Sequence, residues 1–311
     1  MNKKKVTLTP QDCLAIAVKL KALQLVEKTY IEYPEWRRQS YKLPEPKYAS
    51  KLVNVKMSHK QMAQIPMDDI SKSVLCGTLI GDSSIAINKG FANARYQNRH
   101  STRQMSWFVW KNLVVLKKFT NESGVSYQES DGYQQNVTPM PGEILGKVKI
   151  ASKASPELTA LHKIIVDGGK KSMKRSWLNP MNSYFLMTLW LDDGSLMNNR
   201  QGVICLNSTP RREQTILRDY LLKVWGIETS SQQGHVMKNG QVSYRITIDN
   251  VESLLKLLRL IAPLIPVREM LYKICFVPVN NPSLLQRWKT EVLGLVRPEF
   301  VDQVKKFYDT I

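Results

Sequence analysis

Two short apolar stretches, each ending at an aspartate, decide the fold. The first is LCGTLIGDS at residues 75–83 and the second is LMTLWLDDG at residues 186–194. In both, apolar residues run up to an acid that turn-forming residues follow, which predicts a short helix that stops at the acid. The two acids, Asp82 and Asp193, lie 111 residues apart. The spacing therefore indicates an internal duplication.

The rest of the chain carries further traces of a repeat. Lys149-Ile150 is matched by Arg245-Ile246 at an offset of 96 residues, and SGV at residues 123–125 by WGI at residues 225–227 at an offset of 102. The register slips only between elements, where loops can differ in length. Each half is therefore predicted to run helix, two strands, helix, two strands, helix.

Strands are predicted from alternating apolar and polar residues. They cover residues 94–100 and 143–151 in the first half, and residues 202–208, 235–238 and Val242–Ile248 in the second. In the last strand Val242, Tyr244, Ile246 and Ile248 share one face, and polar side chains take the other. This pattern predicts an antiparallel sheet that packs on helices by one face and leaves a polar, basic face free.

The charge balance of the chain narrows the classes of molecule that it could bind. Lys and Arg number 45 against 26 acids, a net charge of +19, as expected of a polyanion binder. On charge alone, a generically basic protein is the alternative to a polyanion binder. The four cysteines form no CxxC pair, so neither a zinc site nor a disulfide framework is indicated. No apolar run reaches the length of a membrane span, and an intracellular, reducing compartment fits best.

We predict five segments along the chain. They are a basic extension over residues 1–69, with a helix over residues 10–30, a first half over 70–166, a glycine-rich and basic linker over 167–176, a second half over 177–279, and a helical tail over 280–311. Direct DNA contact and simple docking are equally consistent with the extension.

Glycine spacing explains how the two helices could meet. Gly77 and Gly81 are four residues apart, hence on one helix face, where missing side chains let a second helix approach. If the helices pack there, Asp82 and Asp193 emerge side by side at the negative ends of two helix dipoles, which is unfavourable unless a cation joins them. Carboxylate ligands without a Cys or His cluster favour Mg²⁺ or a similar hard divalent ion over zinc.

The two stretches resemble the paired LAGLIDADG motifs of homing endonucleases. The second, with WLDDGS at residues 190–195, is similar to the intron-encoded members that carry both motifs in one chain. PLIP at residues 263–266 followed by MLYK at residues 270–273 resembles the segment that closes the second repeat. The resemblance covers residues 70–273. Ser83 and Thr188 depart from it, because the family often has Gly at the first position and Gly or Ala at the second.

The resemblance implies a fold and a reaction. The fold is α+β, a pseudo-twofold duplicated αββαββα arrangement whose two antiparallel sheets form a DNA-binding saddle. The reaction is double-strand cleavage of a long DNA site by a monomer, leaving short 3′ overhangs. Asp82 and Asp193 would bind the metal, and the carbonyls of Gly81 and Asp192 would complete its coordination. The metal would activate a water and neutralise the leaving oxygen. An organelle or another intron-bearing genome would be a fitting source.

Four further residues are candidates for catalysis. Lys273, in MLYK, and Lys153 match the family's basic residues of the second and first active sites. Each lysine could stabilise charge on the phosphate or simply position it. Asn98 and Asn207 are predicted at equivalent places on the first strand after each motif, where they would order water, contact a base or cap the strand.

Polar residues of the strands and the linker are predicted to contact DNA. Arg and Gln can read base edges in the major groove, whereas Lys more often meets phosphate. The candidates are Arg95, Gln97, Arg99, Lys147, Lys149, Lys170, Lys171, Arg200, Gln201 and Arg245. The histidines show no metal-ligand spacing and are predicted to be ordinary polar positions.

Three functions are consistent with this scaffold. The first is a DNA endonuclease, the second is an RNA maturase that assists group I intron splicing, and the third is a DNA-binding regulator. Charge does not separate them, because all three bind polyanions. Retention of both acids favours the endonuclease, since a pure binder has no need for two carboxylates facing phosphate.

Overall fold

The computed structural model describes residues 10–32, 58–129, 145–197, 200–207, 209–236, 240 and 242–311. Parts of the sequence predictions fall outside these residues: residues 1–9 and 33–57 of the extension, and residues 143–144, 208 and 237–238 of three predicted strands.

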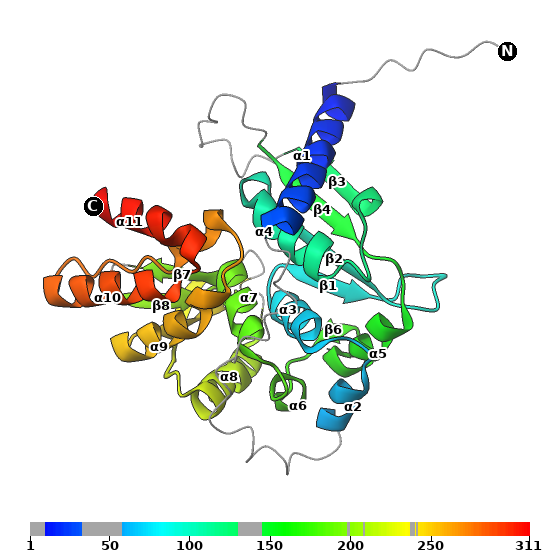
Figure 1. The fold of residues 1–311 in the computed structure, drawn as a ribbon. Helices are drawn as coiled ribbons and strands as arrows, with labels where there is room; N and C mark the ends of the chain where they lie inside the picture. Colours follow the sequence, from blue (N-terminus) through cyan, green and yellow to red (C-terminus); the bar gives the residue numbers. More distant parts are fainter. Residues whose placement is uncertain are drawn as a thin grey trace.

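Two halves repeat one order of elements around a central pair of helices (Figure 1). The first half consists of α3 (Asp69–Ile80), β1 (Ser83–Ala86), β2 (Arg95–Ser101), α4 (Met105–Val109) with its π-helical continuation η3 (Trp110–Val115), β3 (Val125–Gln128), β4 (Lys147–Ala151) and α5 (Pro156–Ile165). The second consists of α7 (Ser183–Asp193), β7 (Gly194–Met197), β8 (Gln201–Ile204), α8 (Arg211–Tyr220) with η5 (Leu221–Trp225), β9 (Ser230–Val236), β10 (Val242–Ile248) and α9 (Val251–Ile261). The predicted duplication is confirmed.

The two four-stranded sheets share one topology. Their orders are β1-β2-β4-β3 and β7-β8-β10-β9, with antiparallel pairing throughout. The predicted alternation along β10 is right for Ile246 and Ile248, which are buried, and wrong at Thr247, which is also buried, and at the start of the strand. A bulge between Val242 and Tyr244 shifts the register, so Val242 is 37% exposed and Ser243 only 1%. A bulge inserts one residue and reverses the faces before it.

The helices α3 and α7 pack against each other at the centre of the molecule (Figure 1). A Cβ atom at Gly77 would lie 2.9 Å from the carbonyl oxygen of Phe185 and 2.9 Å from the Cβ of Thr188. The predicted close approach at this glycine is therefore confirmed. Each helix begins at a capping side chain: Asp68 accepts from the Ser71 amide, and Asn182 accepts from the Tyr184 amide. The caps fix where each helix starts. The packing of the two helices then fixes the positions of the acids at their far ends.

The N-terminal helix lies against the first half and the C-terminal tail against the second (Figure 1). The helix α1 (Pro10–Glu32), predicted over residues 10–30, packs Val18 and Ala22 into an apolar cluster with α4 and β4. In the tail, α10 (Pro282–Leu295) and α11 (Val301–Asp309) carry Trp288 and Tyr308. Their side chains donate hydrogen bonds to the carbonyls of Ile274 and Phe276, at 3.1 Å each. None of the described helices has the length and apolarity needed to cross a membrane.

The predicted linker contains an ordered hairpin. The strands β5 (Val166–Asp167) and β6 (Lys170–Lys171) pair around Gly168 and Gly169, both with positive φ. A short helix, α6 (Arg175–Leu178), then leads to α7. The hairpin matters for the site because it carries Lys171 back to the end of α3.

Candidate active site

The two motif acids converge at the ends of the central helices. Asp82 directly follows Gly81, the C-cap of α3, and Asp193 is the last residue of α7. The Asp193 carboxylate lies against the Gly81 backbone, because a Cβ atom at position 81 would sit only 1.6 Å from its Oδ2 atom. The absence of a side chain at Gly81 thus makes room for the acid of the other half.

Crowding of negative charge disfavours ionisation of both acids. Burial, followed by the charges of Asp82 and Asp192, raises the pKa of Asp193 to about 8. Burial of the Asp82 carboxyl and the charge of Asp192 raise the pKa of Asp82 to about 6, although the side chain is still 42% exposed. Like charges held this close oppose each other's ionisation unless a cation compensates them.

One atom of this group lacks a partner. Asp193 Oδ2 is buried and makes no hydrogen bond within the described part of the chain. A buried acceptor without a donor is costly, and an oxygen of this kind beside a second carboxylate suits a hard divalent cation. Asp82 and Asp193 therefore fit the metal that the sequence predicts, with the carbonyls of Gly81 and Asp192 next to them in the chain.

Two lysines cap the two helix ends in the same way. Lys273 donates to the carbonyl of Gly194 at 2.8 Å and reaches those of Trp190 and Asp192 at 3.5 Å. Lys171 donates to the carbonyls of Leu79 at 2.8 Å and Ser83 at 3.0 Å. Leu79 and Ser83 precede Trp190 and Gly194 by 111 residues each, the offset between the two acids. Lys171 and Lys273 are thus equivalent.

The equivalence changes the assignment of the lysine in the first half. Lys153, predicted for that role, follows β4 and is exposed, and its backbone amide bonds the Phe119 carbonyl. Lys171, predicted as a DNA contact, instead reaches the first motif. Burial lowers the pKa of the Lys171 and Lys273 ammonium groups, and the acids Asp82 and Asp193 oppose that shift. Both cations therefore lie in the field of the acid pair.

Asn98 supports the turn after Asp82. Its side-chain amide donates to Ser83 Oγ at 2.8 Å and to the Asp82 carbonyl at 3.4 Å, and its oxygen accepts from Asn112 at 2.8 Å. The residue is 3% exposed, so it does not reach a base. Ser83 also bonds Thr78 at 2.9 Å, and the turn accommodates the departure from Gly noted in the sequence.

The predicted equivalence of Asn98 and Asn207 is wrong. Strand register pairs Ser83 with Asn98 in the first sheet and Gly194 with Ile204 in the second, so Ile204 takes the place of Asn98. Asn207 lies beyond the end of β8 and is exposed. Asn207 thus lies three residues beyond the position that matches Asn98, and Asn98 lies on β2, the second strand after its motif rather than the first.

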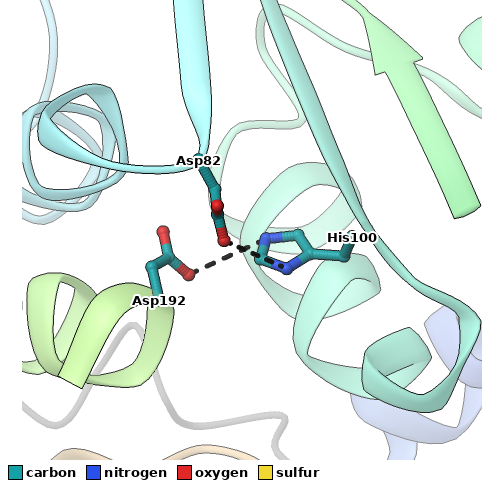
Figure 2. A group of neighbouring side chains, drawn as sticks. All are labelled: Asp82, His100 and Asp192. Carbon is teal, nitrogen blue, oxygen red and sulfur yellow. Dashed lines mark ion pairs between the residues drawn. The ribbon is translucent and has the colours of Figure 1, made fainter. Parts of the chain in front are cut away.

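A buried polar network lies directly below Asp82 (Figure 2). One ligand atom each of Asp82, His100 and Asp192 lie within 4.8 Å of one another. Burial and the neighbouring Lys111 lower the pKa of His100 to about 3, so its imidazole is neutral. The 3.7 Å approaches of its two ring nitrogens to Asp82 and Asp192 are therefore polar contacts between a neutral ring and two acids.

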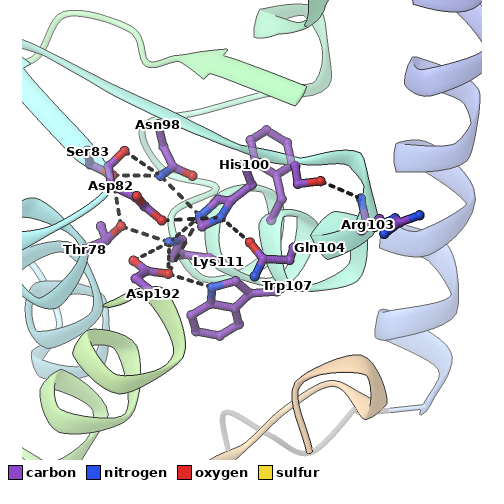
Figure 3. A network of polar contacts seen from close by, with 12 residues as sticks. Thr78, Asp82, Ser83, Asn98, His100, Arg103, Gln104, Trp107, Lys111 and Asp192 are labelled. Atoms are coloured by element: carbon purple, nitrogen blue, oxygen red, sulfur yellow. Dashed lines mark hydrogen bonds and ion pairs between the residues drawn. The ribbon is translucent and has the colours of Figure 1, made fainter. Parts of the chain in front are cut away.

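Lys111 supplies the positive charge of this network (Figure 3). Its ammonium bonds both Asp192 oxygens, at 2.8 and 2.7 Å, and His100 Nε2 at 2.8 Å. Burial alone would raise the pKa of Asp192, but the charge and hydrogen bonds of Lys111 hold it below its ordinary value. Because Lys111 donates to Nε2, the proton of His100 is on Nδ1, which donates to Gln104 Oε1 at 3.0 Å.

The exposed face of the first sheet forms a polar groove of about 570 Å³ that begins at Asp82. Gln97, Arg99, Lys149 and Ser126 line it. Arg99, Lys149 and Ser126 form one cross-strand row, since Arg99 pairs with Lys149 and Lys149 with Ser126. The groove therefore joins predicted DNA contacts of β2 and β4 to Asp82.

The remaining predicted contacts are distributed around the two sheets. Arg95 stacks its guanidinium over the Phe91 ring, 4.1 Å from the centroid. Lys147 lies next along β4, paired with Gln128, and Lys170 is exposed on the linker hairpin. In the second half Arg200 is exposed, Gln201 pairs with Met197, and Arg245 donates to Gln232 at 3.0 Å.

Sequence reasoning missed three residues of the site: Lys171 as a partner of the first motif, His100 and Lys111. For Lys171 a signal was present, because it precedes Lys273 by 102 residues, the offset that relates residues 123–125 to 225–227. His100 and Lys111 approach Asp192 from the other half of the chain. No local spacing could have revealed that contact.

Comparisons with known proteins agree with this geometry. The sequence model of the LAGLIDADG DNA endonuclease family matches residues 72–255, more than half of the chain. A curated relative, protein RecA of Mycolicibacterium fallax, is 24% identical over 255 residues, 77% of this chain and 51% of that protein. The chain thus spans about half the length of that relative.

A solved structure shares the fold. The structure of the homing endonuclease I-WcaI bound to its DNA recognition sequence superposes with a TM-score of 0.55 at 19% sequence identity. The superposition covers 73% of this chain and 98% of that one. The duplicated αββαββα fold is thereby confirmed.

Proposed function

The chain belongs to the LAGLIDADG DNA endonuclease family, and from this membership we propose that it is a site-specific homing endonuclease that hydrolyses both strands of a long DNA site. The observation that carries the proposal is the convergence of Asp82 and Asp193, one from each half, with an unpartnered buried oxygen on Asp193. A protein that only binds DNA gains nothing from acids placed against phosphate.

The residues of the site suit hydrolysis of a phosphodiester. Asp82 and Asp193 would hold Mg²⁺ or another hard divalent ion. Such an ion would lower the pKa of a bound water and neutralise the charge on the leaving oxygen. Lys171 and Lys273 fix the carbonyls around each acid and place a positive charge beside it. Pairing of one acid and one lysine in each half matches the two strands of a duplex, and cleavage is proposed to leave short 3′ overhangs.

The two sheets supply the DNA contact. The groove that starts at Asp82 runs over Arg99, Lys149 and Ser126, a row that offers one bidentate donor and one phosphate contact. The net charge of +19 favours a polyanion along the whole face. We propose that a single chain binds the site, because both halves of the fold are already present in it.

An RNA maturase remains the alternative function on the same scaffold. Splicing assistance makes no use of two acids whose pKa values are raised by burial and by neighbouring carboxylates. The endonuclease therefore explains more of the site than the maturase does.

The proposal is tested by incubating the purified chain with a randomised DNA library and Mg²⁺ and sequencing the cleaved molecules. We expect enrichment of one long site with cuts on both strands at its centre. Binding of the enriched site without cutting would favour a regulator. Binding restricted to a structured intron RNA would favour the maturase and contradict the proposal.

Metal binding should stabilise the protein more at high pH than at low pH. The pKa values of Asp193, about 8, and Asp82, about 6, lie above the ordinary 3.8 of the unfolded chain. Stability from these groups is therefore present in full below the unfolded value and lost as pH rises through the folded values. A cation that replaces the protons restores it. The rise in Tm caused by Mg²⁺ should grow from about pH 6 to about pH 9.

Asp193→Asn is the control for this measurement. The variant lacks the acid with the largest shift, so its Tm should respond less to Mg²⁺ at the higher pH. An equal response at both pH values, or an equal response in the variant, would contradict metal binding by the acid pair.

A further inference from the structure

Lys111 is a charged side chain sealed inside the protein. Its side chain and that of Asp192 both have 0% exposure, and Nζ lies 2.7 Å from Asp192 Oδ2. Thr78 Oγ1 at 2.9 Å and His100 Nε2 at 2.8 Å complete its surroundings. A buried ammonium survives only where anionic and polar acceptors satisfy all its donors, and here four acceptor atoms do so.

The ammonium lies among atoms that could otherwise ligate a metal. The carboxylates of Asp82 and Asp192 and the imidazole of His100 are close enough to surround one ion, and mixed carboxylate and imidazole ligands suit transition metals. Lys111 already bonds both oxygens of Asp192 and one nitrogen of His100. Trp107 Nε1 adds a further hydrogen bond to Asp192, at 2.7 Å.

The network also makes the two helix ends unequal. Asp192 and Gly81 each precede a motif acid, but Gly81 has no side chain and Asp192 has a third carboxylate. Lys111 and Trp107 belong to the first half, in η3 and α4, whereas Asp192 belongs to α7 of the second. The third acid is thus neutralised by the half opposite its own.

We propose that Lys111 is a positioning residue, a resident cation that fixes Asp192 below the active site and reserves the divalent metal for Asp82 and Asp193. The inference rests on the proposed function. Acting through Asp192, Lys111 determines which of three neighbouring carboxylates face the metal. It also prevents other metals from binding to the group of Asp82, His100 and Asp192.

The test is metal binding by Lys111→Met, measured by calorimetric titration with Co²⁺ in the absence of DNA. Removing the ammonium frees Asp192 and His100, so the variant should bind one more Co²⁺ per chain than the unaltered protein. The affinity of Lys111→Met for Co²⁺ should exceed that of the unaltered protein by about ten- to a hundredfold. Groups next to a metal change its binding over this range. The added binding should vanish in Lys111→Met/His100→Ala.

Lys72→Met is the matched control, because Lys72 is also buried but pairs with Asp69 on α3, at 3.5 Å. It should leave the Co²⁺ stoichiometry unchanged. Identical Co²⁺ binding by Lys111→Met and the unaltered protein would overturn the proposal. Cleavage of the selected site by the unaltered protein is measured in parallel, so failure of the endonuclease function is seen separately.

A second variant covers the case in which Lys111→Met does not fold. Lys111→Met/Asp192→Asn removes both charges of the pair, and a neutral pair is often tolerated where a lone buried charge is not. Recovery of a folded protein in the double variant, without the extra Co²⁺, would support the inference. A double variant as unstable as the single one would overturn it.

Discussion

Asp82→Asn and Asp193→Asn are each expected to abolish double-strand cleavage of the selected DNA site, lowering the rate by at least about a hundredfold. The amide removes the charge that binds the metal while keeping the shape of the side chain. Both variants should fold, because burial raises the pKa of each carboxyl and a neutral amide removes the cost of burying a charge there. DNA binding should remain, since the basic groove is untouched. The measurement is conversion of supercoiled plasmid with Mg²⁺, beside binding by gel shift.

Asp302→Asn is the matched control, because the Asp302 side chain is 99% exposed on α11 and the same charge is removed far from the site. It should cut at the normal rate. Nicked circles from a single variant would assign each acid to one strand, and uncut supercoiled circles would show that the acids share one ion. Linear product from the Asp82→Asn/Asp193→Asn double variant at near the normal rate would refute the role of the acid pair.

The fold could be predicted from the sequence because the features that determine it are local and occur twice in the chain. Two apolar helices that end at acids, a matching order of strands and a glycine at the contact each leave a mark in the printed chain. Gly77 shows why: the tight approach to Phe185 and Thr188 requires the absence of a side chain, which the sequence displays directly. The bulge at Val242 leaves no such mark, and the alternation there was wrong.

The site could be predicted from the sequence only in part, because many of its contacts join segments that are far apart in the chain. Lys171 lay in a glycine-rich, basic segment that has the composition of a linker, and only the hairpin of β5 and β6 brings it to Leu79 and Ser83. The match of Asn98 with Asn207 relied on residue type, whereas strand register equates Asn98 with Ile204. Residue type identifies a candidate, and register decides the place.

Asp192 illustrates a second limit on what the sequence can predict about the site. Its neighbour Asp193 reads as the acid of the motif, and nothing in WLDDGS at residues 190–195 indicates which of the two faces a metal. The distinction comes from Lys111 and Trp107, more than 80 residues earlier, which hold Asp192 from below. Two adjacent acids thus acquire opposite shifts of pKa, lowered for Asp192 and raised for Asp193.

Gly81→Ala should separate catalysis from stability. A Cβ atom at this position would fall 1.6 Å from Asp193 Oδ2 and 2.5 Å from Cγ, so the carboxylate has to leave its place. A side-chain end can rotate away at little cost in folding free energy, because the nearest atoms to the added Cβ all belong to the Asp193 carboxylate. We therefore expect a folded protein whose cleavage rate falls by at least about a hundredfold, because a misplaced ligand loses most of its effect.

Gly77→Ala is the matched control one helical turn earlier, with the opposite expected result. Its Cβ would meet the Phe185 carbonyl, part of the α7 backbone, at 2.9 Å. Backbone cannot rotate aside, so α3 and α7 must separate slightly, and the free energy of unfolding should drop by about 1–3 kcal/mol. Cleavage at low temperature should persist, since the separation is slight and falls one helical turn before Gly81 and the acids. Urea unfolding and plasmid cleavage of both variants decide the matter. A Gly81→Ala protein that cuts normally would mean that the place of Asp193 against Gly81 is not needed for hydrolysis.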